Sequence, residues 1–318
     1  MNNTKRMVFA AVATSIPWLA AFGADSSSLK PVFLAGHGPS TVLPTGNELN
    51  PLSASNKATV PATTTTAPPM TFHGGKVLTS TSIRVVLAGP KWATTAFAGD
   101  KIKGLDSFLA GYSNSPYVKT AAEYNGSNGK VGAVVKYQGH SSPSAASVTV
   151  DGRNVMQVAT VACNDLRSSS YAVDTSGNQV VAVFTDMPRP SSAGYCGYHT
   201  AFSCSGVPVQ MTFLWNLDGD ASCSAQDATT GHSQGLAALA NVTAHEVQEV
   251  VTDPQLNAWY DSTGAENADK CAWAFAHTSV PFSNATKWKL QTEWSNSAYA
   301  LKKGYKTLAG APGCIDGL

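Results

Sequence analysis

Charged residues are scarce in this sequence. Asp, Glu, Lys and Arg make up 13% of its 318 residues, about half of the ~25% that is usual in globular proteins. The formal net charge is +1, and no basic run follows the first few positions. Because binding to a phosphate backbone needs concentrated lysine and arginine, nucleic acid is not an expected partner.

Several signatures of cofactor and metal binding are also missing. The sequence has no phosphate-binding loop, no dinucleotide fingerprint and no internal repeat. It has no Cys-x-x-Cys pair, which argues against a zinc site made of thiolates. The apolar fraction of 43% is ordinary, and the length suits one large domain with its own core.

The N-terminal residues carry an apolar run that is too short for a membrane anchor. The stretch "MNNTKRMVFAAVATSIPWLAAFGADSS" begins with Lys5 and Arg6 and ends in small residues, which is the layout of a secretory signal peptide. Pro17 interrupts the run, which is shorter than the ~20 residues needed to cross a bilayer. We expect residues 1–23 to be removed by cleavage after Gly23. The protein is then secreted, extracellular or in the cell wall or periplasm, with no membrane span.

Residues 24–70 differ in composition from the rest of the chain. The stretch "TGNELNPLSASNKATVPATTTTAPP" is rich in Thr, Ser, Pro and Ala and shows no hydrophobic period. It offers little apolar surface to offset the entropy cost of ordering the chain. We interpret residues 24–70 as a linker or propeptide and expect the globular domain to span residues 71–318.

Six cysteines lie in the expected domain, and an even number in an exported chain predicts disulfides. Spacing does not select among the fifteen pairings that six cysteines allow. We expect Cys204–Cys223 as a local bridge and Cys271–Cys314 as a bridge that holds the C-terminus. The cysteines are Cys163, Cys196, Cys204, Cys223, Cys271 and Cys314.

The hydrophobic pattern predicts a mixture of strands and helices. Two segments have helical spacing, residues 101–115 and 233–252, and the second ends before Pro254 as helices tend to do. β-branched or alternating segments predict strands. We expect one α/β domain (α+β is the alternative), with a mixed sheet, a long helix and disulfides. The expected strands are "TSIRVVLAG", "GAVVKYQG", "SVTVDG", "NQVVAVFTD", "VPVQMTFLWN" and "KWKLQTEWSNSA".

The long helix contains His-Glu-x-x-Glu, one letter from the His-Glu-x-x-His of zinc proteases. His245 and Glu249 lie four residues apart, so their side chains share one face of the helix. Zinc accepts imidazole nitrogen and carboxylate oxygen. Glu246 occupies the place of the general base in such proteases. The segment therefore predicts a zincin-like domain with zinc on His245 and Glu249.

A catalytic zinc needs a third protein ligand, and the segment "WYDSTGAENADKCAW" offers Glu266 or Asp269. Two other interpretations remain open. The motif can be an ordinary acidic helix that contains one histidine, and "DSTGAENAD" can bind calcium through its oxygens, although it lacks EF-hand spacing.

Two further residues have a functional and a structural interpretation. His199, in "GYCGYHTAF", can serve as an auxiliary ligand or can stabilise negative charge; packing near a disulfide is the simpler explanation. Ser233 is the centre of "GHSQG", which matches the nucleophile elbow Gly-x-Ser-x-Gly. The residues before it do not form a strand pattern, so we interpret Ser233 as a helix cap.

Several blocks resemble, in order, those of the EXORDIUM-like or phosphate-induced protein family. They are "FHGGKVLTSTSIRVVLAGPKW", "YCGYHTAF", "AHEVQEVVTDPQLNAWYDSTGAENADKC" and "LQTEWSNSA", and they extend from Thr71 to Ala298. The resemblance implies secretion and a single domain. It also implies a functional centre that contains His199, His245, Glu246, Glu249, Glu266 and Asp269.

The resemblance does not supply a reaction, so two hypotheses follow. The first is a metal-dependent hydrolase, a zinc metallopeptidase in particular, that acts on a peptide or protein with Glu246 as base. The second is a non-catalytic extracellular protein that binds cell-wall polysaccharide or a receptor. Exposed aromatic residues would then stack on sugars, namely Trp259, Tyr260, Trp273 and Trp294.

Overall fold

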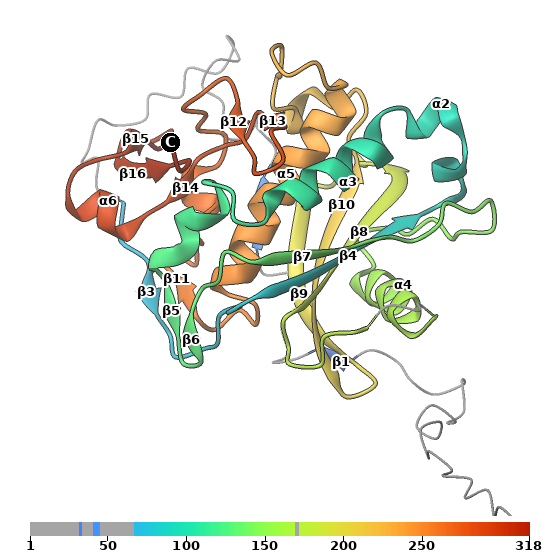
Figure 1. Cartoon of the computed structure of the whole chain (residues 1–318), viewed down its shortest axis with the longest axis horizontal. Coiled ribbons are helices and arrows are strands. Elements are labelled where there is room, and N and C mark those ends of the chain that lie inside the picture. Colours follow the sequence, from blue (N-terminus) through green and yellow to red (C-terminus); the bar gives the residue numbers. More distant parts are fainter. Residues whose placement is uncertain (1–31, 34–40, 45–66, 169–171) are drawn as a thin grey trace, which may run out of the picture.

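A mixed sheet forms the centre of the computed structural model, which describes residues 32–33, 41–44, 67–168 and 172–318 (Figure 1). The strand order is β1-β9-β10-β8-β4-β7, and β2 also pairs with β9. Strands β10, β8, β4 and β7 are parallel, whereas β9 is antiparallel to β10. The strands are β1 (Val32–Phe33), β2 (Thr41–Pro44), β4 (Thr81–Ala88), β7 (Val135–His140), β8 (Gln179–Pro188), β9 (Tyr195–Cys204) and β10 (Val207–Asn216).

Strands β1 and β2 lie within residues 24–70, the range assigned above to a linker or propeptide, and we call them the leader strands. Both pair antiparallel with β9, β1 at Val32↔Ser203 and β2 at Thr41↔His199. Composition gave no sign of them, because each strand is only two or four residues long.

Helices cover both faces of the sheet, as a largely parallel sheet requires. Helix α5 contacts β9 and β10 and packs beside α3, whereas α4 contacts β4, β8 and β10 on the opposite face (Figure 1). The predicted helices at residues 101–115 and 233–252 are confirmed, and α4 was not predicted. The helices are α2 (Thr95–Ala98), α3 (Lys101–Tyr112), α4 (Val155–Ser168), α5 (Gln234–Thr252) and α6 (Asn296–Ala300).

Short strands form the region on the side of α5 that faces away from the central sheet (Figure 1). The segment "KWKLQTEWSNSA" was predicted as one strand, and this is wrong. It forms two short strands and the start of α6. The helix begins here because the side chain of Ser295 caps it by accepting a hydrogen bond from Ala298 N. "SVTVDG" is also not a strand. The remaining strands are β3 (Thr71–Phe72), β5 (Asn125–Gly126), β6 (Gly129–Lys130), β11 (Trp259–Tyr260), β12 (Val280–Pro281), β13 (Lys287–Trp288), β14 (Glu293–Trp294), β15 (Tyr305–Lys306) and β16 (Pro312–Ile315).

Three disulfides join these elements. Cys271–Cys314 is confirmed, whereas the predicted Cys204–Cys223 pair is wrong. Cys204 bonds to Cys163 on α4, and Cys223 bonds to Cys196 at the start of β9. The two cysteines of β9 lie about 26 Å apart along the strand at ~3.3 Å per residue, so they have different partners.

The fold class is that predicted, a single α/β domain with a mixed sheet, a long helix and disulfides. Disulfides are typical of proteins that mature in an oxidising compartment. Among the residues that the structure describes, none of the helices has the length and apolar character needed to cross a lipid bilayer.

Candidate metal centre

Helix α5 is buried on all sides. Every residue from Gly235 to Thr252 is buried, including the histidine and both glutamates. This contradicts the interpretation of the segment as an ordinary acidic helix, since Glu246 and Glu249 have no exposed surface. Carboxylates are almost never fully buried unless they are paired, so the helix requires a partner for its charges.

Ser233 begins this helix and has no catalytic geometry. Its Oγ accepts a hydrogen bond from Leu236 N at 3.2 Å and donates one to Asp100 Oδ1 at 2.6 Å. No strand runs into this turn, so Ser233 is a helix cap, as predicted.

The helical pair His245 and Glu249 converges with Asp269. His245 Nε2 lies 3.0 Å from Glu249 Oε1 and 3.6 Å from Asp269 Oδ1. The backbone N–H of Asp269 donates to Glu249 Oε1 at 3.2 Å, which holds the two segments together. One ligand atom from each of the three residues lies within 4.8 Å of the others.

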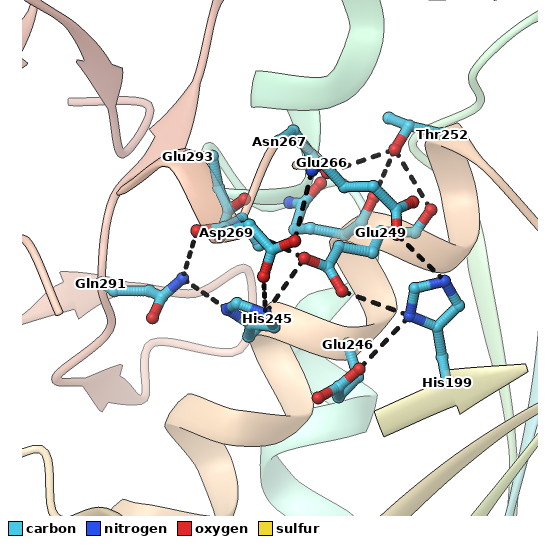
Figure 2. Close-up of polar contacts among 12 residues, drawn as sticks. His199, His245, Glu246, Glu249, Thr252, Glu266, Asn267, Asp269, Gln291 and Glu293 are labelled. Carbon is cyan, nitrogen blue, oxygen red and sulfur yellow. Dashed lines mark hydrogen bonds and ion pairs between the residues drawn. The ribbon is translucent and has the colours of Figure 1, made fainter. Parts of the chain in front are cut away.

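A second group of three lies on the other side of Glu249 (Figure 2). His199, from the middle of β9, places Nδ1 3.2 Å from Glu249 Oε2 and Nε2 3.5 Å from Glu266 Oε2. Their ligand atoms also lie within 4.8 Å of one another. His199 therefore lies in the cluster, contrary to the simpler explanation that it only packs near a disulfide.

The loop after α5 supplies both Glu266 and Asp269, which were predicted as alternatives for one site. A short 3-10 helix at Asp269–Cys271 and the Cys271–Cys314 disulfide hold the loop. Asp261 belongs to neither group of three and forms an ion pair with Lys270 at 2.5 Å. The loop therefore does not gather its own acids into a separate calcium site.

Glu246 contacts the histidine of β9 and not that of its own helix. Its Oε2 lies 3.3 Å from His199 Nδ1. Burial and the charge of Glu249 raise the pKa of Glu246 to about 7, although His199 opposes the shift. A carboxylate with a pKa near neutrality suits a general base.

The other groups also have strongly shifted pKa values. Burial alone would raise the pKa of Glu249, but the attraction of His245 and His199 outweighs it and lowers this pKa to about 2. Burial, partly offset by His199, raises the pKa of Glu266 well above its ordinary value. Burial disfavours the charged forms of both histidines, but the surrounding carboxylates outweigh it and raise the pKa of each.

Several buried polar atoms in the cluster lack a hydrogen bond. Both carboxylate oxygens of Glu266, Oε2 of Glu249, Oε1 of Glu246 and Nε2 of His245 have no hydrogen-bond partner among the described residues. Such atoms normally have a partner, an ordered water or an ion. Imidazole nitrogens and carboxylate oxygens are also the donors that zinc binds, so the residues present fit a divalent cation.

Two residues beside the cluster were not indicated by the sequence. The side-chain amide of Gln291 contacts His245 Nδ1 at 2.7 Å, which directs Nε2 toward the carboxylates. Glu293 accepts a hydrogen bond from Tyr117 Oη at 2.5 Å. Both lie more than forty residues from the helix motif, so no local spacing could have revealed them.

Access to the cluster is limited in this structure. His199, His245, Glu246 and Glu249 have no exposed side-chain surface, whereas the side chain of Asp269 remains 18% exposed. Trp294, one of the proposed sugar-stacking residues, is fully buried, and Trp259, Tyr260 and Trp273 are half-buried. The aromatic residues therefore do not form an exposed platform.

Comparison of the chain with models of protein families, with curated proteins and with solved structures finds no match.

Proposed function

We propose that this chain is a secreted metal-dependent hydrolase with a zincin-like arrangement, a peptidase that acts on peptides or proteins and a relative of the EXORDIUM-like family. The observation that carries the proposal is the convergence of His245, Glu249 and Asp269 with Glu246 on the same helix. Zinc is the cation we expect, because it accepts imidazole and carboxylate together and leaves a position open in catalytic sites.

The residues of the chain have separable roles in this proposal. His245, Glu249 and Asp269 would hold the metal, which would supply Lewis-acid polarisation of a carbonyl group and a water of lowered pKa. Glu246 accepts the proton of the attacking water as the C–O bond forms, and it gives that proton to the leaving amine as the peptide C–N bond breaks. His199, 3.3 Å from Glu246, orients that carboxylate. Gln291 fixes the ring of His245.

The test combines metal analysis with peptide hydrolysis by the full-length chain. We expect bound metal in the purified protein and cleavage of a pool of unstructured peptides, followed by mass spectrometry. Glu246→Gln should lower the rate at least about 100-fold, as loss of a general base does, while metal remains bound. Ser233→Ala should leave the rate unchanged. A metal-free protein without hydrolysis would refute the proposal, and loss of activity in Ser233→Ala alone would favour a serine hydrolase.

The burial of the cluster favours a second candidate, a non-catalytic extracellular protein in which a cation is structural. Closed cation sites without an open position stabilise folds. In that case chelation lowers the melting temperature, no peptide is cut, and the protein is retained on cell-wall polysaccharide. Failure of the protein to bind any cell-wall glycan would refute the proposal that it is a polysaccharide-binding protein.

A further inference from the structure

Glu249 lies between two histidines that come from different elements of the fold. Its Oε1 faces His245 Nε2 on α5 at 3.0 Å, and its Oε2 faces His199 Nδ1 on β9 at 3.2 Å. The two oxygens of one carboxylate thus point to two separate imidazoles (Figure 2). This is the arrangement of a carboxylate that bridges two metal ions.

Each histidine has a second carboxylate of its own. Asp269 lies 3.6 Å from His245, and Glu266 lies 3.5 Å from His199. Glu266 has less than one-tenth of its surface exposed, and neither of its oxygens has a hydrogen-bond partner among the described residues. A single ion at His245, Glu249 and Asp269 would leave this carboxylate with only the imidazole of His199 beside it.

With all its carboxylates ionised, the cluster carries more negative charge than one divalent ion can neutralise. Three carboxylates with at most 1% exposure and a fourth with 18% exposure meet two imidazoles, which must be neutral to act as ligands. In the described part of the chain, their ion pairs are with histidine alone, and none is with lysine or arginine. With all four ionised, one divalent cation leaves two negative charges in the cluster, whereas two divalent cations balance all four. Buried charge without compensation is costly. The carboxylates are Glu246, Glu249, Glu266 and Asp269.

We propose that the cluster holds two divalent cations bridged by Glu249, one with His245 and Asp269 and the other with His199 and Glu266. Two-metal sites with ions about 3.5–4 Å apart occur in hydrolases of several kinds. The inference rests on the metal site of the proposed function, but it does not require the chain to cleave a peptide. Zinc or manganese suits this donor set.

Metal stoichiometry tests the inference on the full-length chain. Chelator-treated protein is titrated with Zn²⁺ alone, followed by calorimetry and by elemental analysis after gel filtration. We expect two equivalents per chain. Glu266→Gln should retain one equivalent, held by His245, and Asp269→Asn should retain one, held by His199. Glu293→Gln, a buried acid that contacts neither histidine, is the matched control and should retain two.

Two results would overturn the inference. One is a single equivalent at saturating Zn²⁺ in the unmodified chain. The other is complete loss of binding in both Glu266→Gln and Asp269→Asn, provided that circular dichroism shows both variants folded. If either variant does not fold, electron paramagnetic resonance of the unmodified chain with Mn²⁺ decides: a spin-coupled pair supports the bridge, and only isolated ions refute it.

These outcomes separate the inference from the proposed function. Two equivalents without peptide cleavage retain the two-cation centre and refute the peptidase. Cleavage with one equivalent retains the peptidase and refutes the second cation.

Discussion

The Cys271–Cys314 disulfide should affect cation binding as well as stability, and Cys163–Cys204 provides a matched control. The two bridges close loops of similar length, with sequence separations of 43 and 41. Loop-closure entropy gives about 4 kcal/mol of stabilisation for either. Replacing both cysteines of a bridge by alanine should therefore lower the free energy of unfolding by about the same amount in each double variant.

The two bridges differ in what they hold near the cluster. Cys271 ends the three-residue turn that begins at Asp269, and single hydrogen bonds, such as that from Trp294 N to Asn267 O at 2.9 Å, hold the rest of that loop. Cys204 ends β9, but β9 is also paired with β10 from Cys204 to Gly197, so His199 stays in place without the bridge. We expect Cys271→Ala/Cys314→Ala to weaken cation binding about tenfold to hundredfold, the range seen when support of a metal ligand is lost. The control pair should leave the affinity unchanged.

The assay has two parts. Urea unfolding in chelator, followed by tryptophan fluorescence, gives the stability of each double variant without metal. Competition with a chromogenic chelator, under conditions where both variants are folded, gives the Zn²⁺ affinity. An equal loss of affinity in the two variants, or no loss in either, would refute the argument that the bridge positions the loop ligands.

Three further predictions concern neighbours of the cluster. Burial raises the pKa of Glu293 well above its ordinary value, so the folded state binds this proton more tightly than the unfolded state, and the contribution of Glu293 to stability falls as pH rises above about 4.3. Glu293→Gln should leave the free energy of unfolding at pH 7 within about 1 kcal/mol of the unmodified chain, or raise it. The variant should also show a weaker dependence of stability on pH. A larger loss of stability in urea titrations would show that Glu293 is ionised in the folded protein. Gly197→Ala would place a Cβ 2.8 Å from Phe213 O and 3.1 Å from Glu246 Oε1. We therefore expect the free energy of unfolding, measured in urea, to fall by about 1–3 kcal/mol. Unchanged stability would contradict this close approach of β9 to α5. Gln291→Leu should weaken Zn²⁺ binding about tenfold to hundredfold, and an unchanged affinity would show that His245 is oriented without Gln291.

The parts of the fold that could be predicted from sequence are those with long, regular patterns. The helix at Gln234–Thr252 has a serine cap and a proline stop, and β8 and β10 are ten-residue strands made mostly of apolar residues. Short strands of two residues, such as β14, exist only because a distant partner pairs with them. Local pattern cannot reveal such elements.

The candidate site divides in the same way. The pairing of His245 with Glu249 follows from helical spacing. The separation of Glu266 and Asp269 between two histidines depends on how the loop folds back, and the place of His199 depends on the sheet. The wrong Cys204–Cys223 pair has the same cause, because β9 carries its two cysteines to opposite ends of one strand.

The leader strands have a consequence for molecules that approach β9. The edge of a sheet can bind an extended peptide through backbone hydrogen bonds, but Thr41–Pro44 already occupies those positions opposite His199. While this strand belongs to the same chain, it competes with an outside peptide for the edge of β9 at a high effective concentration. A cut between residues 45 and 66 would make the competitor a separate molecule that dilution can remove. The edge of β9 beside His199 would then be open to a peptide from another molecule. Cleavage of the chain after the leader strands would therefore control which molecules can pair with β9.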